Sequence, residues 1–282
     1  MPLLQKQERH VRYSEKGDVT DVEDENFDCR EVVGMKIKSK QEDWDSSDWP
    51  VEMISRADRL TSLEYITGLS RVMPGGDIQP IDKTDETRDT LGIARYNHGE
   101  GIYIQIKSQW LQNAVSSRKN RLGTEHANML LSMEKILPSF DAQVPAVRKP
   151  NGSNALTVLH TVSHLVIKEL CGMSGYSLGS IRERLYLDVD DDGNVKTAGF
   201  LLYTSGPSSD GTLGGLVSQA TEKRISDAVR RAMAKRENCS NDPVCFHHKP
   251  IGDEINGAAC HTCVLLPETS CELRNYFLDR KW

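Results

Sequence analysis

Cysteines near the end of the sequence have the type and spacing of metal ligands. Cys239 and Cys245 form one pair with five residues between them, and Cys260 and Cys263 form a second pair with two residues between them. Zn²⁺ prefers four soft ligands at the corners of a tetrahedron, and a C-x₂-C turn offers two thiolates from one loop. We therefore expect one structural zinc ion on these four thiolates, with Cys271 as the substitute for a member of the wider pair.

Buried free thiols and disulfides are the alternatives for these cysteines. The first residues lack the charged, apolar and small-residue pattern of a secretory signal, so we expect the chain in the cytoplasm. Thiols stay reduced there, and seven cysteines then suit metal binding better than cross-links.

Two histidines form a second group that could bind a metal. His160 and His164 stand four residues apart, which places both imidazoles on one face of a predicted helix and within reach of one ion. The metalloprotease pattern, however, requires a glutamate directly after the first histidine, and Thr161 stands there. Because the ligand set is incomplete, we favour hydrogen bonds that hold the helix to its neighbours, with a metal site as the alternative.

A glycine-rich segment followed by a basic helix gives a weaker indication of phosphate binding. Backbone N–H groups at Gly214 and Gly215 could point at an anion, although the spacing matches neither nucleotide-binding fingerprint. Tight packing of the backbone against a helix explains these glycines equally well. The following helix could contact DNA phosphates, or present an ordinary solvated face, through Lys223, Arg224, Arg230, Arg231 and Lys235.

Composition and charge describe an ordinary globular protein. The 282 residues are 38% hydrophobic and 27% charged, without an apolar run long enough to span a membrane. The net charge of −6 argues against a protein that coats nucleic acid by bulk electrostatics. Residues 1–50 hold 13 Asp/Glu and 8 Lys/Arg, a net of −5, so the other 232 residues carry −1 and can present a local basic face.

The elements predicted around these residues define a mixed α/β fold, a sheet with packed helices. The clearest helix is predicted over Asn154–Cys171, where apolar residues recur at helical spacing, and it ends at Gly172 or Gly175. Residues 185–189 and 199–204 are expected to form a hairpin around an Asp-Gly turn. Further strands are expected at residues 31–38 and 101–106, and further helices through residues 110–111, over 116–138, after Ser177 and over 216–236.

Three segments follow from these patterns. Residues 1–50 are predicted to be an acidic, partly disordered tail, with residues 1–30 the most polar part. Residues 51–150 form an N-terminal α/β region, in which residues 57–73 fit helical and extended patterns equally well. Residues 151–282 form a domain whose C-terminal part is stabilised by zinc.

Several motifs of this last segment resemble successive blocks of one family. They are HTVSHLVIKELCGMSGYSLGSIRERLY, FLLYTSGPSSDGTLGGL, CSNDPVC and NGAACHTCVLLPETSCELRNYFLDR. These blocks are similar to the zinc-binding domain found at the end of MrfA-type helicases and in DrmB of the DISARM anti-phage system. Their order fits DrmB better, and RLTSLEYITGLSRV and GEGIYIQI are similar to DrmB segments just before that domain.

The resemblance implies a non-catalytic subunit of a prokaryotic anti-phage complex that partners a DNA helicase or translocase and helps to bind DNA. The chain looks like the C-terminal half of a DrmB-like protein, so a subunit supplying the other half is a second expected partner. No membrane partner is expected. The alternatives are a metal-dependent nuclease acting at His160, His164 or the glycine-rich segment, and a purely structural scaffold. The sequence identifies no catalytic residue.

Overall fold

The structure is a computed structural model. It describes residues 19–22, 27–36, 49–66, 68–69, 79–80, 83–84, 90–91, 93–122, 151–204, 215–248 and 256–282. The helix predicted over residues 116–138 lies outside the described residues beyond Leu122, and Gly214 also lies outside them.

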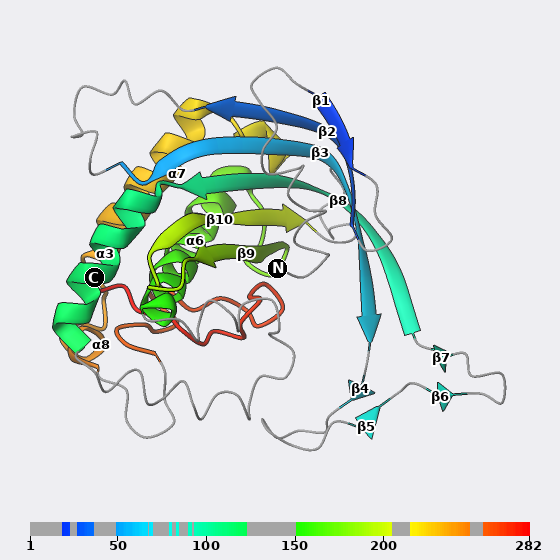
Figure 1. The fold of residues 1–282 in the computed structure, drawn as a ribbon. Helices are drawn as coiled ribbons and strands as arrows, with labels where there is room; N and C mark the ends of the chain where they lie inside the picture. Colours follow the sequence, from blue (N-terminus) through cyan, green and yellow to red (C-terminus); the bar gives the residue numbers. More distant parts are fainter. Residues whose placement is uncertain are drawn as a thin grey trace.

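Six antiparallel strands form one sheet in the order β1-β2-β3-β8-β10-β9 (Figure 1). Their bounds are Val19–Val22 (β1), Phe27–Lys36 (β2), Val51–Ile66 (β3), Ile93–Ile106 (β8), Ile181–Val189 (β9) and Val195–Thr204 (β10). Beyond β3 and β8, Gly68–Leu69 (β4) pairs with Gln79–Pro80 (β5), and Lys83–Thr84 (β6) pairs with Thr90–Leu91 (β7). One sheet thus combines strands from all three predicted segments.

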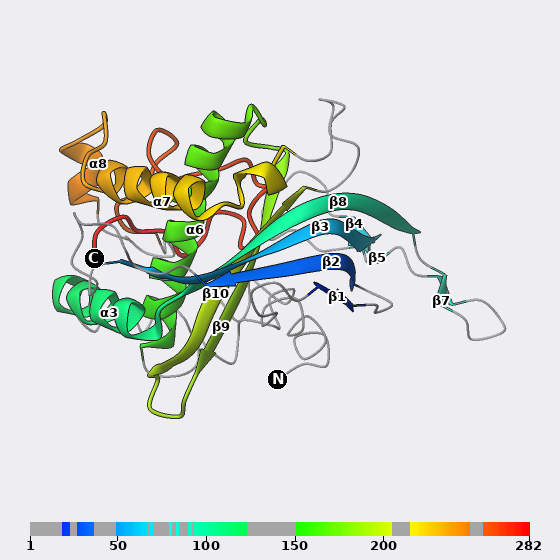
Figure 2. The same ribbon diagram turned by 90° about the horizontal axis from the view of Figure 1, so that it is seen from above.

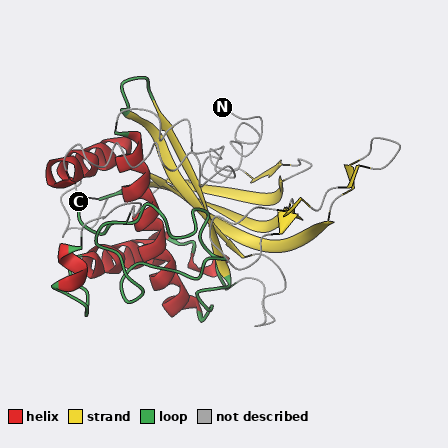
Figure 3. Ribbon diagram, turned by 90° about the horizontal axis from the view of Figure 1, so that it is seen from below, coloured by secondary structure: helices red, strands yellow, loops and turns green. Residues whose placement is uncertain are grey.

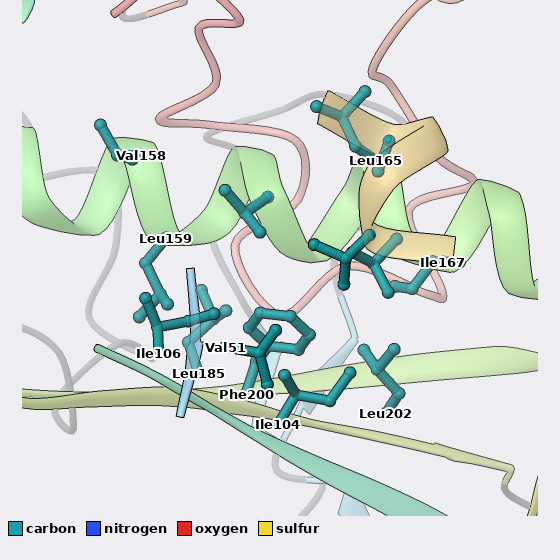
Figure 4. Close-up of a cluster of buried hydrophobic side chains, with 14 of the residues drawn as sticks. Val51, Ile104, Ile106, Val158, Leu159, Leu165, Ile167, Leu185, Phe200 and Leu202 are labelled. Atoms are coloured by element: carbon teal, nitrogen blue, oxygen red, sulfur yellow. The ribbon is translucent and has the colours of Figure 1, made fainter. Parts of the chain in front are cut away.

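Each face of the sheet buries a different cluster, as the two-residue period of strands requires. On β8, Ile102 and Ile104 belong to the main core, whereas Tyr103 between them belongs to a smaller cluster that includes Tyr186. The rings of Tyr103 and Tyr186 meet edge to face, with centroids 5.9 Å apart. Figure 4 shows Phe200 and Ile104 projecting from the strands toward Leu159 of the helix above them.

That helix, α6 (Gly152–Ser174), is the centre of the fold, because 18 of its 23 residues are buried. It packs on β9 and β10 and is flanked by α3 (Ser108–Leu122) and α7 (Glu222–Arg236). Figures 2 and 3 show the helices gathered on one side of the sheet. Gly175 ends α6 in the left-handed conformation (φ 78°), and its N–H bonds the carbonyl of Cys171. The predicted mixed α/β fold is confirmed.

The helix predicted after Ser177 is wrong. Residues 177–180 form a turn, in which the N–H of Ser180 bonds the carbonyl of Ser177, and β9 begins at Ile181. Burial alternates over residues 181–184, and β9 pairs with β10 along its length. Pairing with a strand outweighs the local preference of a serine for a helix start.

Two further boundaries differ from the prediction, and a segment that was left open is assigned. The last long helix begins at Glu222, because Val217–Gln219 forms a short 3₁₀ turn (η1) and Thr221 caps α7 by accepting from the N–H of Arg224. Residues 57–66, which the pattern left open, belong to β3. Strand β1 lies inside the region predicted as a polar tail, because backbone pairing with β2 draws it into the sheet.

Candidate metal centre

Four cysteine sulfurs lie together beside the C-terminal end of α7. The Sγ atom of Cys260 is 3.5 Å from that of Cys239 and 3.6 Å from that of Cys263, whose sulfur is 3.7 Å from that of Cys245. All four sulfurs lie within 4.8 Å of one another. Tetrahedral Zn–S bonds of about 2.3 Å place the sulfurs about 3.8 Å apart, so the cluster fits a zinc ion.

Two local structures present these thiols. Residues 260–263 form a tight turn, in which the carbonyl of Cys260 accepts from the N–H groups of Cys263 and Val264. The N–H of Cys260 in turn points at the sulfur of Cys263, 3.3 Å away. In the other pair, Cys239 precedes a turn and Cys245 lies in the short helix α8 (Val244–His247) that follows the turn. The N–H of Asn241 points at the sulfur of Cys239. Backbone N–H groups directed at sulfur stabilise thiolates before a metal arrives.

Arg280 connects the loop that contains Cys239 and Asp242 to the end of α7. Its side chain is fully buried, forms an ion pair with Asp242 and donates to the carbonyl of Arg236 at 2.9 Å. The other carboxylate oxygen of Asp242 accepts from the N–H of Cys239. The C-terminal residues therefore fix the position of the first cysteine pair.

Positive charge compensates the thiolates. Lys168 of α6 bonds the carbonyl of His261 beside the cluster. Burial lowers the pKa of Lys168, and the neighbouring thiolates of Cys263 and Cys260 oppose that shift. Burial raises the pKa of the Cys260 thiol, but hydrogen bonds, the Asn241 amide among them, outweigh burial and lower it to about 6. A thiol that ionises this readily is a competent metal ligand.

A second group combines both predicted histidines with Cys271. His160, His164, Glu183 and Cys271 place their ligand atoms within 4.8 Å of one another, and all four residues are buried. Burial opposes protonation of His160, but Glu183 and then Cys271 outweigh burial and raise the pKa of His160 well above its ordinary value. Cys271, proposed as a substitute zinc ligand, thus lies with the histidines.

The glycine-rich segment is described from Gly215 onward. A Cβ atom on Gly215 would lie 2.9 Å from the ring of Tyr176, so close packing accounts for this glycine. The next N–H, that of Leu216, donates to the buried carboxylate of Glu100 at 2.7 Å. Glu100 also accepts from the hydroxyl of Tyr176. A carboxylate of the chain itself thus bonds the N–H that follows the predicted pair, Gly214 and Gly215, and phosphate binding at that pair stays a prediction.

Some basic residues of α7 have a partner within the chain, and others are exposed to solvent. Arg224 bonds Gln219, Arg230 pairs with Asp227, and Lys235 pairs with Glu169 of α6. Lys223 and Arg231 are exposed. Their role in DNA binding stays a prediction.

The first comparison concerns the class of protein. Residues 162–264 match the family described as the MrfA Zn-binding domain, and the matched range contains all four clustered cysteines. This part of the chain is therefore similar to a zinc-binding domain of the MrfA type, and the match and the four-cysteine cluster together support a zinc ion as cofactor. Among the residues that the structure describes, no helix combines the length and the apolarity needed to cross a membrane.

The second comparison is more particular. The chain is 34% identical over 190 residues to the DISARM protein DrmB of Bacillus paralicheniformis, an alignment that covers 65% of this chain and 31% of DrmB. The resemblance to DrmB seen in the motifs is confirmed. The chain spans about a third of the length of the curated relative that it matches.

Three residues of these sites lie inside the quoted motifs, but residue type and spacing assign them no role. Glu183 stands between Arg182 and Arg184 in β9, Arg280 lies near the last residue, and Glu100 lies in β8. Their shared signal is burial, since each has 1–3% of its surface exposed. Charged residues are buried this deeply when they are paired, and pairing across the fold is not visible in spacing.

Proposed function

We propose that this chain is a non-catalytic, DrmB-like subunit of a prokaryotic anti-phage defence complex that partners a DNA helicase or translocase. The observation that carries the proposal is the 34% identity to DISARM protein DrmB over 190 residues, combined with the zinc-binding domain. A subunit that supplies the remaining DrmB-like sequence is the second proposed partner.

The zinc ligands in this proposal are Cys239, Cys245, Cys260 and Cys263. Their sulfurs fit the edges of a Zn–S tetrahedron, and four protein ligands leave no open position for water or substrate. The ion therefore has a structural role, which agrees with a subunit that binds partners and does no chemistry of its own.

Co-expression with a DNA helicase or translocase of the same organism tests the partnership. The two chains are expected to elute as one peak in gel filtration, at physiological salt and after nuclease treatment to remove DNA bridges. Two separate peaks would contradict the proposed partnership. A complex that forms only when the subunit with the remaining DrmB-like sequence is added would place that subunit between them.

DNA binding is proposed for the exposed side of α7. Lys223 and Arg231 are exposed, whereas Arg224, Arg230 and Lys235 have partners within the chain. Reversing both exposed charges is expected to weaken DNA binding. It should also lower the slope of log K against log salt by about 2, because each phosphate contact contributes close to one unit.

The matched control for this charge reversal is Lys196→Glu, an exposed lysine at the start of β10. The Lys223→Glu and Arg231→Glu double variant is expected to lose affinity and salt dependence while the control keeps both. Equal behaviour of the two variants would remove α7 from the proposed interface. Absence of DNA binding by the wild-type chain, even at low salt, would favour the scaffold alternative.

The structure gives the nuclease alternative no specific support. His160 and His164 are fully buried, so a DNA phosphate has no access to either imidazole. In the described part of the glycine-rich segment, the N–H of Leu216 already donates to Glu100.

A further inference from the structure

We infer that His160, His164, Glu183 and Cys271 form a second metal site, a closed site for a divalent cation of the zinc type. The histidine pair has too few ligands in its own stretch of sequence, and the fold supplies two more from distant segments. The histidines lie on α6, Glu183 on β9 and Cys271 in the C-terminal segment. The inference is independent of the proposed function.

The donor atoms converge on one point. The Nε2 atom of His160 lies 2.8 Å from Oε1 of Glu183 and 3.1 Å from the sulfur of Cys271. The Nε2 atom of His164 lies 3.1 Å from the same carboxylate oxygen. Zinc bonds of about 2.0–2.3 Å give a tetrahedron with edges of about 3.3–3.8 Å, so an ion requires these atoms to separate by a few tenths of an ångström.

Neighbouring groups orient the donors as they do around known metal ions. The Nδ1 atom of His164 lies 3.1 Å from the carbonyl of Val264, which accepts its proton and leaves Nε2 for a metal. The N–H of Asn275 donates to the sulfur of Cys271 at 3.0 Å. The hydroxyl of Ser163 donates to the second oxygen of Glu183. Three of the four ligands therefore have an orienting partner.

A divalent ion would balance the charge at this position once both imidazoles are deprotonated. One carboxylate, one thiolate and two neutral imidazoles carry a charge of −2, so a divalent cation makes the site neutral. Neutrality matters because all four side chains are buried, and an uncompensated buried charge is very costly. The cysteine cluster, in contrast, would keep a charge of −2 with zinc and lies partly exposed beside Lys168.

Such an ion would join α6, β9 and the C-terminal segment at the centre of the fold. The match to the MrfA Zn-binding domain covers residues 162–264, so it includes His164 and Glu183 but neither His160 nor Cys271. Four protein ligands and full burial give the ion a structural role and leave no coordination position for a substrate.

The first test uses the unmodified full-length chain, purified with zinc and desalted. Metal analysis is expected to give two zinc ions per chain. Zinc-edge X-ray absorption is expected to give about 2.5 sulfur ligands per zinc, the mean of a four-sulfur and a one-sulfur site. One zinc ion per chain with about four sulfur ligands would overturn the inference and leave a hydrogen-bonded network in its place.

Variants separate the two sites. Cys271→Ser and Cys260→Ser are each expected to retain one zinc ion, and Cys171→Ser, the matched control on α6, is expected to retain two. The thiol of Cys171 belongs to neither of the two groups of converging ligand atoms, so its loss should remove no zinc ion. No zinc in a folded Cys260→Ser variant overturns the second site alone. One zinc in both the wild type and Cys260→Ser contradicts the four-cysteine site instead. Circular dichroism confirms which variants are folded.

Discussion

At the scale of single residues, the account depends on charged side chains that the fold buries and pairs. Arg280 is the clearest example, because it joins the cysteine loop to α7 through Asp242 and the carbonyl of Arg236. A buried ion pair adds little stability compared with apolar packing, but removal of one partner leaves the other unpaired. Such residues therefore tolerate substitution poorly.

Replacing Arg280 with methionine is expected to lower the free energy of unfolding by about 2–4 kcal/mol and to weaken zinc retention. The physical reason is that Asp242, which orients the N–H of Cys239, loses its cation. Chemical denaturation and zinc release to a chelator measure the two effects. The control is Arg274→Met, the same change at an exposed position of the same segment, expected to stay within about 0.5 kcal/mol. Equal effects at both positions would contradict the role given to Arg280.

The environment of Tyr176 predicts that the stability of the protein falls at alkaline pH. Burial and then the charge of Glu100 raise the pKa of its phenol above the ordinary value near 10. Above that pH the unfolded chain releases a proton that the folded chain retains, so stability falls as pH rises through this range.

The Tyr176→Phe variant is expected to be about 1–2 kcal/mol less stable at neutral pH, because Glu100 loses a buried hydrogen bond. Its stability should then decline less than that of the wild type above pH 10. Urea denaturation from pH 7 to 11 measures the difference, with Tyr276→Phe as control. Parallel curves of unfolding free energy against pH for the wild type and Tyr176→Phe would contradict a raised pKa at Tyr176.

At the scale of elements, replacing each of two glycines with alanine is expected to change stability in opposite directions. A Cβ atom on Gly99 of β8 would lie 1.9 Å from the backbone oxygen of Thr204 on β10, whereas one on Gly172 of α6 meets nothing within 4 Å. Gly99→Ala is expected to destabilise the protein by about 3 kcal/mol, because strand backbone must move. Gly172→Ala is expected to stabilise it by about 0.5–1 kcal/mol through helix propensity. Thermal denaturation of both variants checks the contrast, and a neutral Gly99→Ala would contradict the observed approach of β8 and β10.

The sequence predicts elements well where the pattern is local and strong. The helix α6, the β9–β10 hairpin and the cysteine pairs are all visible in periodicity or spacing. The turn at Ser177 was missed because pairing of β9 with β10 outweighs a local capping signal. The ligand group around His160 was incomplete for a related reason, since Glu183 and Cys271 reach it only through the tertiary fold.

At the scale of the whole molecule, the proposed metal sites join residues 256–282, which form no helix or strand, to the rest of the fold. Residues 256–282 contain turns but no helix or strand in the structure, yet they pack against α6 and provide three of the proposed ligands. The N–H of Asp279 donates to Thr161 of α6, so hydrogen bonds assist this docking. Zinc can supply on the order of 10 kcal/mol in such loop-rich segments.

Removal of zinc is therefore expected to release residues 256–282 before the sheet unfolds. Hydrogen exchange measured with and without a chelator should show loss of protection in this segment first, while β8 and β10 remain protected. Simultaneous loss of protection in both regions would contradict a local role of the metal.

Anomalous scattering at the zinc absorption edge from a crystal of the purified chain tests the central claim most directly. We predict a zinc peak enclosed by Cys239, Cys245, Cys260 and Cys263, about 2.3 Å from each sulfur. Density without a zinc peak among these four sulfurs, or sulfurs joined as disulfides, would contradict the account.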